Sequence, residues 1–315
     1  MPYYAIRHLT RYRYNAPVRE NITEARMQPR TEGNQRCVKF NLTVAPQALV
    51  AAYQDYLDNT VHHFDIPTAH VQIKLIAEAL VEMQPFLPLP EALPEDLWQT
   101  LDTLKGDYWD FLSPSHFAQP TPILQNLADE FRLVRHADPL TVLKQLNQNM
   151  YNTFGYAPQS TRVDSPIDEA IAARRGVCQD FTHIMIALVR GLGIPCRYVS
   201  GYLFHRREDH DRSAEDATHA WLETFLPGLG WVGFDPTNNL IAAERHIRVA
   251  VGRDYSDVPP TRGVFKGDAQ EDLSVGVRVT LAEAPPEPDE SILPDTPWSP
   301  PPLEEEDQQW QQQQQ

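Results

Sequence analysis

The sequence is poor in the features that mark secreted, membrane-spanning and metal-stapled proteins. Three cysteines are scattered through 315 residues, at Cys37, Cys178 and Cys196, and no CxxC pair occurs. An odd number at irregular spacing argues against a disulfide framework and favours a reducing compartment. The N-terminus lacks the apolar core of a signal peptide, and no run approaches the roughly 18 apolar residues of a membrane span. We therefore expect a cytoplasmic protein that makes no membrane contact.

Positive charge is also in short supply. The formal net charge is −16, and the 33 residues from 283 to 315 contain nine carboxylates but no lysine or arginine. The rest of the chain therefore carries about −7 (−16 + 9), which is only mildly acidic. A protein that binds nucleic acid needs basic surfaces to neutralise phosphates, so we expect no nucleic-acid partner.

The order of local patterns predicts two domains, a linker and a tail. Residues 1–84 contain short aromatic and β-branched segments broken by Pro, Asn and Asp, which is typical of a β-sandwich. Residues 85–121 are rich in proline and acidic residues and read as a linker, with a short helix near 95–104. Residues 122–283 mix helical and strand patterns and are expected to form an α+β catalytic core. Residues 284–315 are rich in Pro, Glu and Gln and are predicted to be a disordered tail.

The most informative helix in the core is predicted to begin at Cys178. Ser165-Pro166 predicts the start of a preceding helix that stops near Gly176, and the next helix ends at Gly191 to Pro195. Apolar residues cover most of the surface of this second helix, which predicts that it is buried. A helix N-terminus favours a thiolate over a thiol, so a cysteine at this position is a candidate nucleophile.

A hairpin after this helix supplies the two other groups that a cysteine nucleophile needs. Residues 218–225 and 231–236 read as strands joined by the turn Pro227-Gly228-Leu229-Gly230. His219 and Asp235 are separated by an even number of residues, so a turn with an odd number of residues puts them on the same face. Asp235 would then orient His219, and His219 would hold the thiolate of Cys178 as an ion pair.

Other residues are weaker candidates. The backbone N–H of Cys178 is a natural oxyanion donor, and Gln179 and Tyr156 are candidates for the second donor. Trp221 is a candidate for contact with the substrate, although hairpin packing explains it equally well. We expect Cys37 and Cys196 to fill space in the interior.

Three ordered blocks resemble the core of the transglutaminase-like superfamily. They run from Gly176 to Phe181, from Leu192 to Tyr202, and through His219-Ala220-Trp221 to Gly233-Phe234-Asp235-Pro236-Thr237. Residues 8–14 and 55–65 are similar to the β-rich domain that precedes this core in a bacterial branch. The resemblance implies a papain-like α+β core, a triad of Cys178, His219 and Asp235, and a thioester intermediate.

The resemblance leaves the reaction open. It is compatible with a cysteine protease or amidase acting on a peptide or protein substrate, and also with protein-glutamine cross-linking or deamidation. A different class of function is an inactive transglutaminase-like module that binds partners. No cofactor and no metal are expected, because the sequence shows no EF-hand pattern and no compact set of metal ligands.

Overall fold

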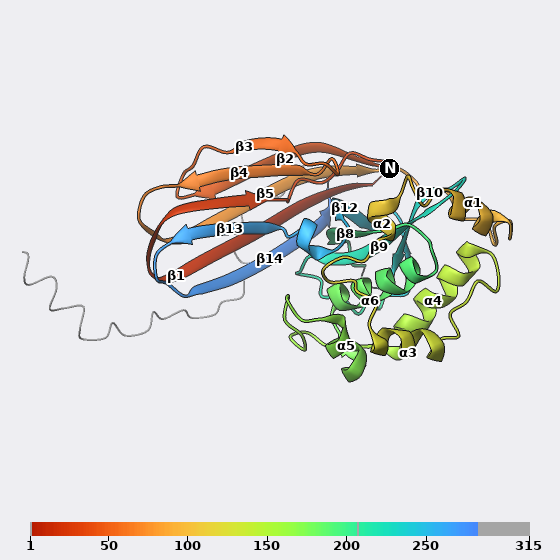
Figure 1. Ribbon diagram of the computed structural model, residues 1–315. Coiled ribbons are helices and arrows are strands. Elements are labelled where there is room, and N and C mark those ends of the chain that lie inside the picture. Colours follow the sequence, from red (N-terminus) through yellow and green to blue (C-terminus); the bar gives the residue numbers. More distant parts are fainter. Residues whose placement is uncertain (1, 207, 283–315) are drawn as a thin grey trace, which may run out of the picture.

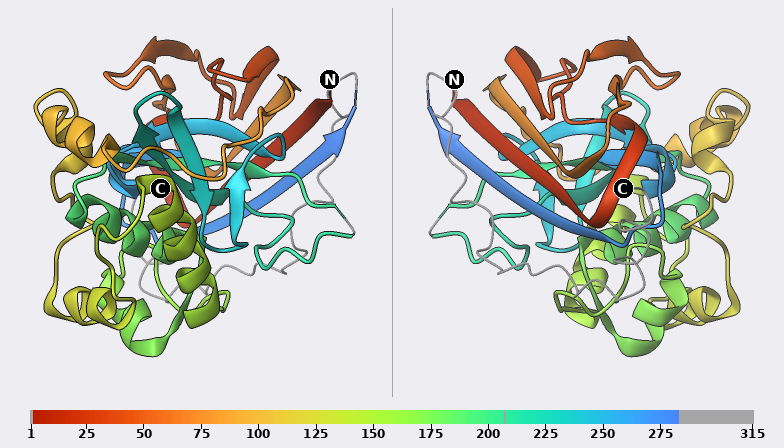
Figure 2. Two further views of the ribbon diagram at one scale, coloured as in Figure 1. Left: turned by 90° about the vertical axis from the view of Figure 1, so that its right-hand side faces the viewer. Right: turned by 90° about the vertical axis from the view of Figure 1, so that its left-hand side faces the viewer.

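The computed structural model describes residues 2–206 and 208–282, which form a β-domain and a mixed α+β domain (Figure 1). Figure 2 shows from two further sides that the N-terminal strands and the helices occupy opposite parts of the molecule. The predicted tail at residues 284–315 lies outside the described residues. In the described part of the chain, no helix is long and apolar enough to cross a membrane.

The β-domain is organised by one long strand that belongs to two sheet faces. β1 pairs through its first half with β5 and β14, and through its second half with β4 and β13, while β2 and β3 extend the two faces. The strands are β1 (Tyr3–Ala25), β2 (Gln35–Ala45), β3 (Ala51–Gln54), β4 (Thr60–Ile66), β5 (His70–Met83), β13 (Thr261–Lys266) and β14 (Glu271–Leu281).

Two features of this domain differ from the sequence-based expectation. Asn15-Ala16-Pro17 is one of the Pro and Asn breaks expected to end a short strand, but β1 changes partners there and continues, with a register shift between Arg13 and Val18. Proline has no N–H to donate to a ladder, so it fits at such an irregularity. The core was also expected to extend to residue 283, but β13 and β14 return to the β-domain and pair with β1.

The α+β domain is built on a five-stranded antiparallel sheet with the order β11-β10-β9-β8-β12. Its strands are β8 (Cys196–Leu203), β9 (His219–Leu226), β10 (Gly230–Asp235), β11 (Leu240–Ala242) and β12 (His246–Gly252). The helices are α1 (Leu97–Thr103), α2 (Trp109–Leu112), α3 (Pro122–Glu130), α4 (Pro139–Thr153), α5 (Ile167–Ala173), α6 (Cys178–Gly191) and the 3-10 turn η1 (Tyr255–Asp257). Two short strands, β6 (Gly155–Tyr156) and β7 (Arg175–Gly176), pair in parallel. The predicted linker contains α1 and α2, and Trp98 and Leu101 of α1 pack into the main core.

The two domains share buried apolar contacts. One cluster joins Tyr4 and Ile6 of β1 and Val277 of β14 with Tyr202 of β8 and Ile247 of β12. The first half of β1 therefore packs against the sheet that carries the candidate site. Burial of apolar side chains from both domains fixes their relative position.

Candidate active site

Cys178 is the first residue of α6, as the sequence predicts. The helix is held at its start by Asp180, whose carboxylate accepts hydrogen bonds from the backbone N–H of Val177 at 2.8 Å and the hydroxyl of Thr161 at 2.7 Å. Gly176 is needed just before this start, because a Cβ there would lie 2.6 Å from Oδ2 of Asp180. The backbone N–H of Cys178 belongs to the first turn, whose N–H groups have no acceptor inside the helix.

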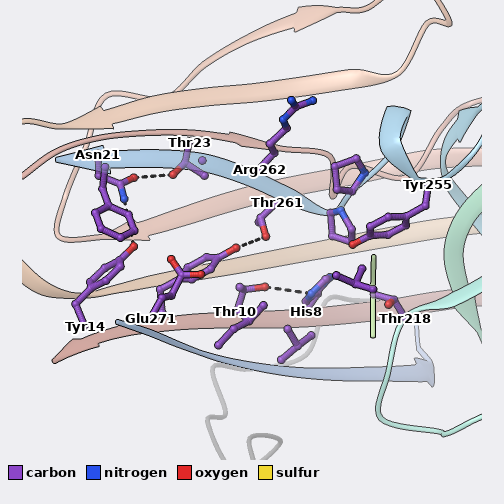
Figure 3. A pocket seen from close by; sticks show the side chains of 18 of the residues that line it. His8, Thr10, Tyr14, Asn21, Thr23, Thr218, Tyr255, Thr261, Arg262 and Glu271 are labelled. Atoms are coloured by element: carbon purple, nitrogen blue, oxygen red, sulfur yellow. Dashed lines mark hydrogen bonds between the residues drawn. The ribbon is translucent and has the colours of Figure 1, made fainter. Parts of the chain in front are cut away.

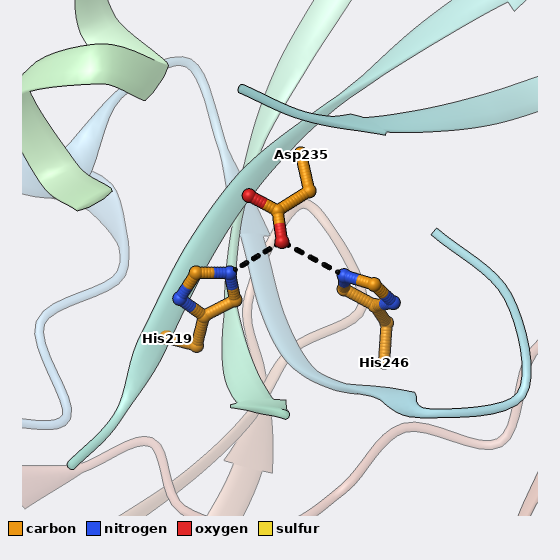
Figure 4. A group of neighbouring side chains, drawn as sticks. All are labelled: His219, Asp235 and His246. Carbon is orange, nitrogen blue, oxygen red and sulfur yellow. Dashed lines mark hydrogen bonds and ion pairs between the residues drawn. The ribbon is translucent and has the colours of Figure 1, made fainter. Parts of the chain in front are cut away.

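His219 and Asp235 are joined by a buried hydrogen bond across the β9–β10 hairpin (Figure 4). His219 Nε2 lies 2.8 Å from Oδ2 of Asp235. The register pairs Phe234 with Leu222 and Gly230 with Leu226, which leaves an odd number of residues in the turn. Both side chains therefore project from one face of the hairpin, as the even spacing in the sequence predicts.

Asp235 is completely buried and is surrounded by hydrogen-bond donors. Besides His219, its Oδ2 accepts from His246 Nε2 at 3.1 Å and from Asn238 Nδ2 at 2.9 Å. Its Oδ1 accepts from the backbone N–H groups of Thr237 at 3.0 Å and Asn238 at 3.2 Å. Burial alone would raise the pKa of this carboxyl, but the charge and the hydrogen bond of His219, followed by His246, hold it far below its usual range.

The same interaction makes His219 a strong base. Burial lowers its pKa, but the Asp235 carboxylate and then the neighbouring Cys178 outweigh burial and raise the pKa of His219 to about 10. The imidazole is therefore protonated at neutral pH. Its other ring nitrogen, Nδ1, is buried and makes no hydrogen bond to any described residue. Nδ1 is thus the nitrogen available to the thiol of Cys178.

His246 belongs to this cluster, although no sequence pattern singled it out. It is the first residue of β12, which pairs with β8 at the far edge of the sheet from β10. Burial, opposed by Asp235, lowers the pKa of His246, so a neutral ring donates its Nε2 proton to the carboxylate. The only sequence signal was a histidine at a strand start, because the contact depends on strand order.

The three side chains also have the composition of a metal site. One ligand atom from each of His219, Asp235 and His246 lies within 4.8 Å of the others. Both imidazoles point a nitrogen at the same carboxylate oxygen, at 2.8 and 3.1 Å, so each ring can donate a hydrogen bond to it. As arranged, the cluster is a hydrogen-bond network.

The weaker candidates occupy different places. Tyr156 is half-buried, and burial, followed by the charge of Cys178, raises the pKa of its phenol. Gln179 donates through Nε2 to the carbonyl of Val163 at 2.8 Å and so anchors the preceding loop. Trp221 is fully buried and packs against the rings of His219 and His246. Contact between Trp221 and a substrate, one of the expectations from sequence, is therefore excluded by burial.

Comparison with known proteins identifies two family regions in the chain. Residues 4–82 match the bacterial transglutaminase-like N-terminal region, and residues 126–236 match the transglutaminase-like superfamily. The first region covers β1 to β5, and the second contains Cys178, His219 and Asp235. His246 lies beyond the matched core.

Individual relatives agree with this assignment. An uncharacterized protein of Mycobacterium leprae is 31% identical over 277 residues, which cover 87% of this chain and 96% of that protein. A protein-glutamine gamma-glutamyltransferase of Pseudomonas aeruginosa is 32% identical over 130 residues, which cover 39% of this chain and 19% of that protein. The crystal structure of a Cytophaga hutchinsonii protein, named a putative cysteine protease, shares the fold with a TM-score of 0.70 and 22% identity. The similarity covers 95% of this chain and 93% of that one.

A labelling experiment tests whether Cys178 is set apart from the other cysteines. Burial raises the pKa of both Cys37 and Cys196 to about 11, so at pH 7 these side chains stay protonated and react slowly with iodoacetamide. We expect Cys178 to be alkylated at least about tenfold faster at pH 7, because the thiolate is the reactive form. Peptide mapping by mass spectrometry measures the three rates. Equal rates at all three positions would contradict the activated-thiol assignment.

A pair of substitutions tests the role of His246. His246→Leu removes a donor to a buried carboxylate and should lower the free energy of unfolding by about 1–3 kcal/mol. His246→Gln places an amide N–H near the same position and should lower the free energy of unfolding by clearly less. Urea unfolding at pH 7 measures both. An equal loss in the two variants would show that packing, and not the hydrogen bond, is the contribution of His246.

Proposed function

Because the chain belongs to the transglutaminase-like superfamily, we propose that it is a cysteine enzyme that forms a thioester with the carbonyl of a peptide or amide substrate. The observation that supports this most directly is the buried Asp235–His219 pair, with its free nitrogen available to Cys178. Hydrolysis of the thioester, as in a protease or amidase, is the proposed outcome.

The first half of the proposed reaction breaks the amide bond. The sulfur of Cys178 attacks the carbonyl carbon and forms a C–S bond, and the negative charge moves to the carbonyl oxygen. The backbone N–H of Cys178 donates to that oxygen, and we propose Tyr156 as the second donor. When the C–N bond breaks, the leaving amine takes a proton from His219. The products of this half are a thioester on Cys178 and a neutral His219 imidazole.

The second half returns the enzyme to its starting state. Water attacks the thioester carbonyl, and Nδ1 of His219 accepts its proton. The C–S bond then breaks and restores the thiolate beside an imidazolium. Throughout, Asp235 fixes the ring orientation and balances its charge, which is the role of the third member of such a triad.

Protein-glutamine cross-linking or deamidation is the second candidate. It is favoured by the similarity of the core to the Pseudomonas aeruginosa protein-glutamine gamma-glutamyltransferase. In both cases the thioester forms on a glutamine side chain and releases ammonia. An amine then attacks the thioester in cross-linking, whereas water attacks it in deamidation.

A small activated ester tests the nucleophile without knowledge of the natural substrate. With p-nitrophenyl acetate, we expect the wild-type protein to carry an acetyl group on Cys178, seen by mass spectrometry. Cys178→Ala should lose this acylation, and His219→Gln should slow it by about 10³-fold or more. Cys37→Ala is the matched control and should behave as the wild type. Acylation of the Cys178→Ala protein at the wild-type rate would contradict the proposal.

Casein incubated with and without methylamine separates the reaction types by product mass. Shortened chains indicate a protease, methylamide groups on glutamine indicate amine transfer, and conversion of glutamine to glutamate indicates deamidation. We expect shortened chains in the leading proposal.

A further inference from the structure

The β-domain contains a cavity next to its apolar core, which Val18, Phe64 and Ile73 help to form. The cavity has a volume of about 580 Å³, within the range of ligand pockets, and lies between the two sheet faces (Figure 3). Thr10 and Tyr12 of β1 and Leu273 and Val275 of β14 form one wall, while Thr23 of β1 and residues of β13 form the other.

The lining is mostly apolar in area, but it also carries hydroxyl and amide groups that hydrogen-bond to one another. Tyr12 and Thr261 share a hydrogen bond, Thr23 donates to Asn21 at 2.7 Å, and Asn21 donates to Tyr14 at 3.2 Å. Burial raises the pKa of Tyr12 to about 12, so its phenol is neutral at pH 7. The interior thus offers hydroxyl, amide and aromatic groups without net charge. The two charged lining residues, Arg262 and Glu271, are exposed and opposite in sign.

One end of the cavity is lined by residues that neighbour the candidate active site. Thr218, which precedes His219 in the chain, and Val163, whose carbonyl accepts the hydrogen bond of Gln179, both line it. Figure 3 shows Thr218 and Tyr255 at one end and Tyr14 and Asn21 at the other. The cavity therefore extends from the neighbours of Cys178 and His219 into the β-domain.

The wall formed by β14 also has an open hydrogen-bonding edge. The N–H of Val277 donates to the carbonyl of Asp216 at 2.9 Å, so at this residue the backbone groups point away from β1. Because the direction alternates along an antiparallel strand, the N–H and C=O groups of Val275 and Leu273 point the same way. Among the described residues, β1 is the strand that pairs with β14, so this edge is available to an incoming chain.

We propose that this cavity binds an extended, uncharged segment of the polypeptide substrate, which pairs with the free edge of β14 and leads the scissile carbonyl to Cys178. A backbone that adds to a sheet edge gains main-chain hydrogen bonds, and neighbouring pockets select alternate side chains. Charged side chains are disfavoured because the interior has no charge to pair with them. This inference rests on the proposed function of Cys178. The experiment below gives one result if the cavity inference fails and a different result if the proposed function fails.

Two alkylating reagents of different length provide the test on the full chain. One is iodoacetamide, and the other is an iodoacetyl group on uncharged tetrapeptides of Ala, Ser, Thr and Val. Each reacts with the sulfur of Cys178, which displaces iodide. The rate with the peptide reagent is divided by the rate with iodoacetamide. This ratio cancels the reactivity of the Cys178 thiolate and reports only on binding of the peptide. We expect a ratio of about ten or more in the wild type, the effect of one modest binding contribution.

Two variants change the cavity in different ways. Leu273→Asp adds a charge to a lining side chain that is 51% exposed, so the fold should tolerate it. Val275→Pro removes an N–H from the free edge and leaves the ladder with β1 intact. Both should bring the ratio close to one without slowing iodoacetamide. Val264→Asp is the matched control. Val264 is 67% exposed, and it does not line the cavity, although its neighbours Gly263 and Phe265 do. This control should keep the wild-type ratio.

The outcomes distinguish the two claims. If iodoacetamide does not prefer Cys178 over Cys37 and Cys196, the proposed function fails. If it does prefer Cys178, but the ratio is near one in the wild type or is unchanged in both cavity variants, the cavity inference is wrong and the proposed function stands. A loss in Leu273→Asp alone would contradict edge pairing. A faster reaction of iodoacetyl-chitobiose than of the peptides would overturn the peptide assignment in favour of a glycan.

Discussion

The arrangement of the candidate site depends on one buried carboxylate. Asp235 has no exposed surface, and a charge in such a place is costly unless donors surround it. Two imidazoles, one side-chain amide and two backbone N–H groups meet this requirement. The chemistry follows from the same requirement, because the carboxylate that must be neutralised also keeps His219 protonated next to Cys178. Stability and reactivity of the site therefore have a common origin.

The fold brings these groups together from separate elements. The β9–β10 hairpin carries His219 and Asp235, β12 brings His246 from the opposite edge of the sheet, and α6 presents Cys178 at its N-terminus. Trp221 fills the space beneath both imidazoles and fixes their rings by packing. The β-domain contributes through the shared apolar cluster and through a cavity that reaches the neighbours of the site. We propose that it takes part in substrate recognition.

Local signals predicted much of this arrangement. Gly176 and the apolar run after Cys178 fixed the helix start, and the parity of the hairpin spacing placed His219 and Asp235 on one face. Long-range pairing could not be predicted in this way. The contact of His246 depends on β12 lying beside β8, and the return of β14 to the β-domain depends on pairing between Tyr4 and Leu281. The cavity follows from that return, since β13 and β14 supply much of its wall.

The central claim is that Asp235 holds His219 as a charged partner of Cys178, and the protonation state of its ring tests this directly. In protein labelled with ¹⁵N-histidine, the ring nitrogens of His219 can be assigned by comparison with His219→Gln and followed from pH 5 to pH 11. Our account predicts that both nitrogens carry protons at pH 7 and that one proton is lost near pH 10. A ring that is already neutral at pH 7 and titrates near the ordinary value of about 6.5 would contradict it.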